Sequence, residues 1–436
     1  MRKECWISGP GPIAPNNRTL EFFLCGRKAG AGMAAFSIMA SCIGGTATIA
    51  MLALAARAGW PAFWWLGSGS VGLGLLGLFF AKKIRASRAA TLPEILDMAL
   101  GPQCRLFASV IVLLSSLAIV AAQFNAIGVI LSAFAGLDFG WSVILGSSAI
   151  WLYTSIGGQS AVMKSDIWQF VLLAGALVIA LLWLLRLPEC AAVLSRAPLV
   201  LANRDLPLSR VVYFITVFGG SFTIGPMIFG RILSARSPRA AKSGALLAAL
   251  GLAVMAALIA AMGIAMSGLP LESASPEQIL LAVCNLAFPR WLVWLLIIGL
   301  VAAVVSSADS CLLTAAIICS HDLHLGGTVR ATRLAMTIIA IASCLIVFGG
   351  KGILGLLLAA SDIYTCGIVA PVIVLLLGGK KLRPAPFLAA MTAGGLCGLA
   401  AAISGNYFWS FAGLGLSAAL AIAGLPKKKN GPINLP

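Results

Sequence analysis

Two short stretches, IGGTATIAM at residues 43–51 and GGSFTIGPM at residues 219–227, decide the fold that we expect. Each places a glycine pair and hydroxyl side chains inside an apolar segment, and the second adds Pro226. Glycine costs about 1 kcal/mol relative to alanine in a helix interior, and proline removes a backbone hydrogen bond. Interrupted helices at matching places of two halves point to the central site of a transporter. Close packing between helices, which small residues also permit, is the alternative interpretation of either stretch alone.

The composition places the rest of the chain in a membrane. The 436 residues are 61% hydrophobic and only 10% charged, with a mean hydropathy of +1.04, whereas soluble domains carry about 25% charged residues. We therefore expect an all-α polytopic membrane protein. The expected spans, about twelve in number, are residues 31–56, 62–81, 106–134, 140–156, 167–185, 211–230, 241–267, 291–318, 332–349, 353–378, 385–403 and 407–425.

The positions of the two interrupted stretches predict an inverted repeat. They lie in the first and sixth spans, so they cross the membrane in opposite directions. Aligning the glycine pairs places Gly44 on Gly219 and Thr48 on Thr223. We expect a cytoplasmic segment, a 5+5 transporter core, two additional C-terminal helices and a basic tail; their ranges are 1–30, 31–378, 379–425 and 426–436.

The basic residues predict the orientation. About three quarters of the 30 lysines and arginines fall on the side that holds both termini, which predicts cytoplasmic termini in a multi-pass protein of the cell membrane. The net charge of +17 is thus explained by topology and anionic lipid rather than by nucleic-acid binding. No nucleophile–base pair or metal-ligand cluster is evident at membrane depth, so we do not expect an enzyme.

A third stretch, AAVVSSADSCLL at residues 302–313, carries hydroxyls and a carboxylate inside an apolar span. On a helix, Ala303, Ser306, Ser307 and Ser310 share one face, and Asp309 lies at its edge. A lone serine often bonds only to its own helix, but an intramembrane aspartate costs about 2.5–3.5 kcal/mol on the insertion scale and is a functional candidate. Hydroxyl, carbonyl and carboxylate oxygens suit a small hard cation.

Five ordered motifs resemble those of the sodium:solute symporter family, which includes sodium–proline, sodium–pantothenate, sodium–sugar and sodium–sialic acid symporters. The most specific resembles the family's Y…GG..AV…D..Q signature. The motifs are FFLCGRKAG (22–30), ATLPEIL (90–96), YTSIGGQSAVMKSDIWQF (153–170), FGRILSARSPRAAK (229–242) and AAVVSSADSCLLTAAIICSHDL (302–323). The resemblance covers roughly residues 20–380 and implies the inverted-repeat fold of the leucine-transporter type.

The resemblance also implies a sodium site. Its ligands would be the carbonyl oxygens of Ala40, Ile43 and Ala303 and the hydroxyls of Ser306 and Ser307.

Some family members hold a second sodium ion deeper in the membrane. The matching positions here are Asp166, Ser306 and Ser310, and Asp309 stands where the family has a serine. Asp309 can strengthen cation binding, carry a proton or pair with a basic group, and the sequence leaves these alternatives open.

The expected function is secondary active transport, in which inward sodium movement drives uptake of a small organic solute by alternating access. Candidate solute contacts are Thr46, Ala47, Gly220, Ser221, Phe222, Gln123 and Asp362. Asp362 would favour a cationic or polyhydroxy solute, whereas helix N-termini at the breaks would favour a carboxylate. The alternatives are proton-coupled or uncoupled transport on the same scaffold, or a membrane sensor. We expect the sodium ion, the solute and the lipid bilayer as partners, and a monomer as the functional unit.

Overall fold

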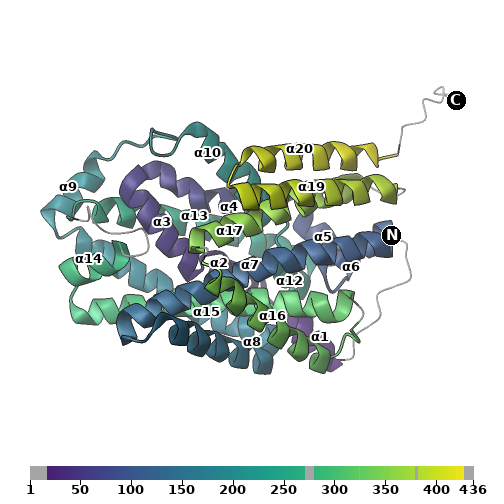
Figure 1. Cartoon of the computed structure of the whole chain (residues 1–436), viewed down its shortest axis with the longest axis horizontal. Helices are drawn as coiled ribbons and strands as arrows, with labels where there is room; N and C mark the ends of the chain where they lie inside the picture. Colours follow the sequence, from purple (N-terminus) through teal and green to yellow (C-terminus); the bar gives the residue numbers. More distant parts are fainter. Residues whose placement is uncertain (1–16, 271–278, 324, 351, 379–381, 427–436) are drawn as a thin grey trace.

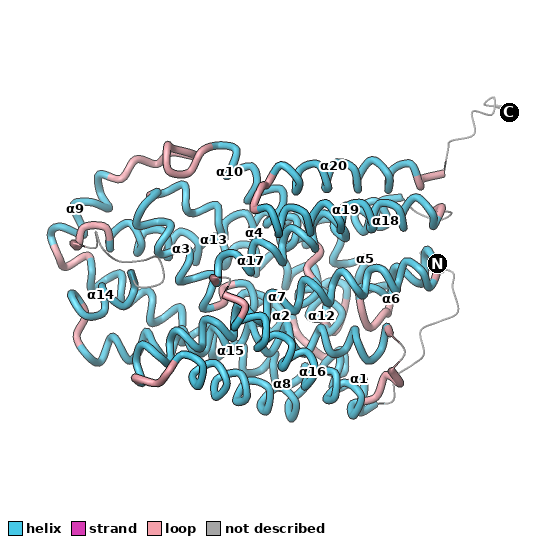
Figure 2. Tube along the Cα trace, viewed as in Figure 1, coloured by secondary structure: helices cyan, strands magenta, loops and turns pink. Residues whose placement is uncertain are grey.

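The protein is described by a computed structural model of residues 17–270, 279–323, 325–350, 352–378 and 382–426. These residues fold into helices whose long axes run mainly side by side (Figures 1 and 2). Helices α1, α5 and α6 lie at one end of the bundle, and α9 and α14 lie at the other (Figure 1).

The part of the chain that precedes the second interrupted stretch contains two of the longest helices. Its elements are α1 (Asn17–Leu24), α2 (Ala31–Cys42), α3 (Gly45–Ala58), α4 (Trp64–Leu75), α5 (Ala81–Ser87), α6 (Leu92–Leu100), α7 (Pro102–Ala135), α8 (Phe139–Leu184), α9 (Pro188–Arg196) and α10 (Leu208–Tyr213).

The remaining elements begin with the second interrupted stretch. They are α11 (Gly219–Thr223), α12 (Pro226–Ser234), α13 (Pro238–Met266), α14 (Ile279–Ala287), α15 (Arg290–Ile317), α16 (Val329–Phe348), α17 (Ile353–Tyr364), α18 (Ala370–Gly378), α19 (Pro384–Ser404) and α20 (Phe408–Ala423). π-Helical turns continue several of them, namely Leu76–Phe80, Phe214–Phe218, Ile318–Asp322 and Thr365–Val369.

The first interrupted stretch contains a broken helix, as the sequence predicted. Helix α2 ends at Cys42, Ile43 leaves the helical conformation, and α3 begins at Gly45. The chain bends by 61° between the two helices. The break therefore leaves the last carbonyls of α2 without partners in their own helix.

The second break lies five residues beyond the glycine pair that we aligned. Gly219 and Gly220 are helical, whereas Ile224 and Gly225 separate α11 from α12. A methyl group on Gly219 would lie 2.7 Å from the Ser68 carbonyl oxygen, so this glycine serves close packing against α4. Pro226, at the start of α12, needs no backbone donor there. Our alignment of Gly44 with Gly219 was therefore wrong, and the break itself matches Ile43–Gly44 with Ile224–Gly225.

Helix α8 is a hairpin of two helices. Gly158 has φ +60° and ψ −170°, a conformation that only glycine adopts easily. The Tyr153 hydroxyl lies 2.7 Å from the Ser165 hydroxyl, whereas twelve residues of straight helix would separate them by about 18 Å. The spans expected at 140–156 and 167–185 are thus the two arms of α8.

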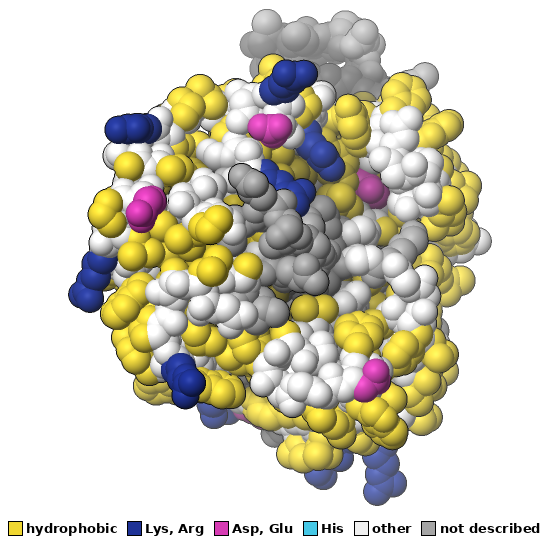
Figure 3. Space-filling view, turned by 60° about the vertical axis from the view of Figure 1, so that its left-hand side comes forward, with side chains coloured by type: hydrophobic (Ala, Val, Ile, Leu, Met, Phe, Trp, Pro, Cys, Tyr) yellow, Lys and Arg dark blue, Asp and Glu magenta, His cyan; other side chains and the backbone are white. Residues whose placement is uncertain are grey.

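The surface suits a lipid environment. Nine of the described helices are long and apolar enough to cross a membrane, or up to ten when α2 and α3 count as one span. Figure 3, in which the side with α9 and α14 comes forward, shows hydrophobic side chains over much of the surface, with Lys, Arg, Asp and Glu side chains scattered among them. Large side chains such as Trp168, Leu345 and Ile403 are exposed, which water would disfavour. The total of about twelve spans stays a prediction.

Replacing Gly158 by alanine should destabilise the protein by about 1–3 kcal/mol, because alanine is strained in this conformation. Its methyl group would also lie 2.6 Å from the Phe22 ring. The measurement is thermal unfolding of the purified protein. The matched control is Gly175→Ala, where a methyl group meets no atom within 4 Å and should be neutral or stabilising. Equal melting temperatures for the two variants would contradict the hairpin geometry.

Candidate functional site

Helix α15 lies against the end of α2, and its serines contact the carbonyl oxygens there. The Ser306 hydroxyl oxygen is 3.0 Å from the carbonyl oxygen of Ala40 and 3.1 Å from that of Ala303. The Ser307 hydroxyl donates to the Ser41 carbonyl at 3.1 Å. The two serine side chains are buried. Two segments more than 250 residues apart thus bring hydroxyl and carbonyl oxygens together at the first break.

This group of oxygens includes four of the five predicted sodium ligands. The fifth, Ile43, is the residue that caps α2 at the break, where carbonyls have no partner within the helix. All five ligands would be oxygen atoms without a sulfur or imidazole ligand, which is the preference of hard cations such as sodium. The residues present therefore fit a sodium ion, and the set stays a prediction.

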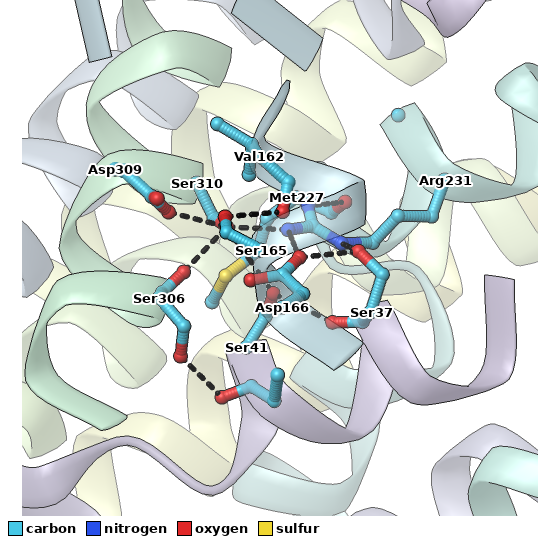
Figure 4. Close-up of polar contacts among 12 residues, drawn as sticks. Ser37, Ser41, Val162, Ser165, Asp166, Met227, Arg231, Ser306, Asp309 and Ser310 are labelled. Atoms are coloured by element: carbon cyan, nitrogen blue, oxygen red, sulfur yellow. Dashed lines mark hydrogen bonds and ion pairs between the residues drawn. The ribbon is translucent and has the colours of Figure 1, made fainter. Parts of the chain in front are cut away.

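A buried ion pair lies one helical turn deeper (Figure 4). An Arg231 terminal nitrogen is 3.1 Å from an Asp166 carboxylate oxygen, and both side chains are fully buried. The Arg231 Nε donates to the Ser37 hydroxyl at 2.8 Å, and the guanidinium also contacts the Ser310 hydroxyl. The Ser37 hydroxyl donates to the same Asp166 oxygen at 2.5 Å. The arginine thus joins α12 to α2, α8 and α15.

The second carboxylate of this cluster, that of Asp309, has fewer hydrogen-bond partners than that of Asp166. Asp309 accepts a hydrogen bond from the Ser310 hydroxyl at 3.1 Å. Its other oxygen, Oδ2, and Asp166 Oδ1 are buried without a hydrogen-bond partner among the described residues. Asp166 contacts the guanidinium directly, whereas Asp309 is connected to it through the Ser310 hydroxyl. Ser41 connects this cluster to the predicted sodium ligands, since its hydroxyl lies 3.2 Å from that of Ser310.

A cavity of about 80 Å³ lies between the two breaks. Of the predicted solute contacts, Ala47, Gln123, Ser221 and Phe222 line it, together with Ser115, Phe218, Met227, Ser307, Ser361 and Tyr364. No Asp, Glu, Lys, Arg or His belongs to its described lining. The site is thus a neutral chamber bounded by aromatic rings and small polar side chains.

Gly220 and Asp362, which were also predicted as contacts, lie elsewhere. Gly220 faces the Thr365 side chain, and the side chain of Thr46 is outside the described part of the structure. Asp362 accepts hydrogen bonds from Tyr213 at 2.8 Å and from Ser410 at 2.7 Å. Asp362 therefore ties α17 to α10 and α20 instead of lining the cavity.

Tyr364 is one of the cavity residues that we did not predict as solute contacts. Its hydroxyl donates to the Ile224 carbonyl oxygen at 2.5 Å, and Thr365 donates to the Val217 carbonyl at 2.7 Å. Tyrosine in an apolar span carries no distinctive sequence signal, although it needs a partner when buried. Helix α17 thus satisfies the second break in the way that α15 satisfies the first.

A polar cluster closes the end of the bundle where α6 lies. Thr91 caps α6, and its hydroxyl donates to Asp322, which also pairs with Arg105 at 2.9 Å. Glu94 lies 3.4 Å from His321. Burial favours the neutral form of Glu94, but His321 and the hydrogen bond from the Ala90 N–H outweigh burial and lower the pKa of its carboxyl group. Among the residues that the structure describes, no group of three or more His, Cys, Asp or Glu side chains could hold a metal ion, and the cluster ties α6 and α7 to the end of the span that begins with α15.

Comparison with known proteins identifies the family. The model of the sodium:solute symporter family matches residues 22–394. The chain therefore belongs to the sodium:solute symporter family, as its motifs predicted.

Two choline transporters are among its curated relatives. The chain is 27% identical over 343 residues to the high-affinity choline transporter 1 of Caenorhabditis elegans, covering 70% of this chain and 56% of the relative. It is 29% identical over 275 residues to the high affinity choline transporter 1 of Homo sapiens, covering 58% and 47%. The chain spans about half the length of the curated relatives it matches.

Solved structures show the same fold. A Na⁺-coupled sialic acid symporter in a substrate-bound, outward-open state has a TM-score of 0.78 at 18% identity, covering 93% of this chain and 91% of that chain. A nucleobase-cation-symport-1 family transporter with bound bromovinylhydantoin has a TM-score of 0.67 at 13% identity, covering 92% and 93%. The predicted leucine-transporter-type fold is confirmed.

Arg231→Met should destabilise the protein by about 3–5 kcal/mol, because it leaves the buried Asp166 carboxylate without its cation. The measurement is thermal unfolding of the purified variant. Adding Asp166→Asn should recover part of the loss, since the unpaired charge is then removed. Arg236→Met is the control, because Arg236 is exposed. A stable single variant would contradict the importance of this ion pair.

Proposed function

We propose that this protein couples inward sodium movement to the uptake of a small organic solute by alternating access. The observation that supports the proposal is the convergence of Ser306 and Ser307 with the carbonyls of Ala40, Ser41 and Ala303. A cation held there joins α15 to the broken first span, so its binding favours one arrangement of the two repeats.

The energy available supports accumulation. One charge crossing about 100 mV contributes about 2.3 kcal/mol, and a roughly tenfold sodium gradient adds about 1.4 kcal/mol. Together they support an accumulation of several hundredfold for one sodium per uncharged solute. A cationic solute gains a further factor from the membrane potential.

Sodium should raise the melting temperature of the purified protein relative to potassium at equal ionic strength. A ligand at about 100 times its dissociation constant stabilises the folded state by about 2.7 kcal/mol. The double variant Ser306→Ala/Ser307→Ala should lose this sodium-specific rise, because two of the predicted ligands are gone.

Ser343→Ala is the matched control for these melts. Ser343 is a buried serine of α16 whose hydroxyl donates to the Leu117 carbonyl. It is not one of the predicted sodium ligands. It should keep the sodium response. Wild-type protein that melts identically in both salts would contradict sodium coupling.

We propose in addition that Asp166, Asp309 and Ser310 form a second cation site, for a sodium ion or a proton. The proposal is supported by two buried carboxylate oxygens that lack hydrogen-bond partners in the described structure, and by an arginine that pairs with Asp166 and is connected to Asp309 through the Ser310 hydroxyl. Asp309→Asn removes one of the two carboxyl groups at nearly constant shape. If a second sodium ion binds there, this variant should keep only part of the sodium-dependent stabilisation. If the variant keeps all of that stabilisation, the second cation is a proton instead.

The lining of the central cavity favours a solute with a positive, weakly hydrated group. The hydroxyls of Ser115, Ser221 and Ser361 donate to backbone carbonyls, so they present oxygen lone pairs to the cavity. Phe218, Phe222 and Tyr364 supply aromatic rings, whose faces attract quaternary ammonium groups. We therefore propose a quaternary ammonium solute of the choline class, in keeping with the choline transporters among its relatives.

Reconstituted protein should take up radiolabelled choline in a sodium gradient, and Phe222→Leu should weaken its half-saturation about tenfold. A desolvated cation–π contact contributes up to about 2 kcal/mol, and leucine keeps most of the apolar volume. Phe107→Leu, on the exposed side of α7, is the control and should behave as wild type. Uptake of a neutral solute in preference to choline would contradict the proposed substrate class.

We propose that the membrane is the cell membrane and that the end of the bundle with α1, α5 and α6 is cytoplasmic. Lys82, Lys83, Arg85 and Arg88 gather in or after α5 at that end, in agreement with the positive-inside rule. We also propose that a single chain suffices, because the predicted sodium ligands and the cavity come from one chain.

A further inference from the structure

We propose a second solute site, on the cytoplasmic side of the central cavity, in which Gln159 binds the solute during its release. The inference rests on the proposed function and names a site for the same solute, a hydroxyl-bearing quaternary ammonium ion. Its basis is a small cavity of about 20 Å³ that Gln159, Phe23, Phe229, Thr91 and Thr314 help to line.

The position of this cavity places it on a path from the central one. Pro226, at the start of α12, lines both cavities. On α15, Ser307 lines the central cavity and Thr314 lines the smaller one. Seven residues separate them, which is the same helix face about 10.5 Å further along. A solute that moves along this face toward α6 therefore reaches the second cavity.

Gln159 supplies the polar group of the site. Its side chain is only 2% exposed, and its Nε2 has no hydrogen-bond partner in the described part of the chain. A buried amide donor without a partner costs about 1–3 kcal/mol. Gly158, with its positive φ, begins this arm of α8. Gly230 lies opposite the amide and has no side chain; a methyl group there would be in ordinary contact with the amide nitrogen, at 3.8 Å.

The lining repeats the chemistry of the central chamber. Phe23 and Phe229 supply rings, and Thr91 and Thr314 supply hydroxyls, as phenylalanines and serines do above. Neither charged residues nor histidines belong to the described lining. An aromatic enclosure with few polar groups is typical of small-molecule sites. The two rings suit the ammonium group, and the Gln159 amide suits the solute hydroxyl.

The cavity is closed on its far side. The Phe23 ring of α1 packs edge-on against His321 at 6.3 Å, and Thr91 is held by Asp322. In this arrangement the space admits a water-sized group, for which about 10–15 Å³ suffices. The solute occupies the site when α1 and α6 separate from α12, so the site acts on the release side alone.

The test measures choline half-saturation separately from each face, by zero-trans uptake and zero-trans efflux in oriented proteoliposomes. Gln159→Leu keeps the size of the side chain and removes the amide. Loss of one buried hydrogen bond should raise the cytoplasmic half-saturation about tenfold and leave the outer one within about twofold. Gln169→Leu, on the same helix and outside both cavity linings, should change neither value.

Two outcomes would overturn the inference while leaving the proposed function intact. Unchanged half-saturation on both faces of Gln159→Leu would mean that the cavity holds a water only. Equal weakening on both faces would mean that Gln159 acts through the central site or the fold. Wild-type protein without sodium-dependent choline transport would instead refute the proposed substrate class, and the second site with it.

Discussion

A helix that ends inside a membrane must satisfy its last carbonyl groups without water, and this constraint shapes the centre of the molecule. At the first break, Ser306 and Ser307 of α15 contact the carbonyls of α2. At the second, Tyr364 of α17 donates to Ile224. The sodium ion that we propose at the first break would be bound by these carbonyls and by the serine hydroxyls together. In the function that we propose, ligand binding would depend on the positions of α15 and α17, as alternating access requires.

The Arg231 cluster shows how the same region tolerates charge. A guanidinium bound to Asp166, Ser37 and Ser310 joins four helices beside the predicted sodium ligands. Removing one partner of such a pair costs far more than the pair contributes, because the other charge stays buried. The cluster thus fixes α12 against α2 and α15, and Asp309 adds a second buried carboxyl group that is connected to the arginine through Ser310.

Particular residues show where sequence reasoning succeeded. The glycines, Pro226 and the apolar spans located both interrupted stretches, because helix propensity and hydropathy are local properties. The face shared by Ala303, Ser306 and Ser307 followed from helical periodicity alone. The same reasoning misplaced the second break, because Gly219 allows close contact with α4. In the sequence, a glycine pair that allows close packing looks the same as one that interrupts a helix. We predicted Asp362 as a solute contact because its sequence position shows its depth in the membrane. The sequence does not show toward which helices its side chain points.

The sequence by itself determined the class of fold, the interrupted spans and the family, because apolar length, helix breakers and ordered motifs are written along the chain. Only the tertiary structure decided which side chains meet. Arg231 pairs with a carboxylate 65 residues away, Tyr364 reaches a break 140 residues away, and Gln159 faces a cavity built by α1, α6, α12 and α15. Such partners depend on how whole helices pack. Packing brings together surfaces that are far apart in the sequence, so a local pattern of residues does not predict it.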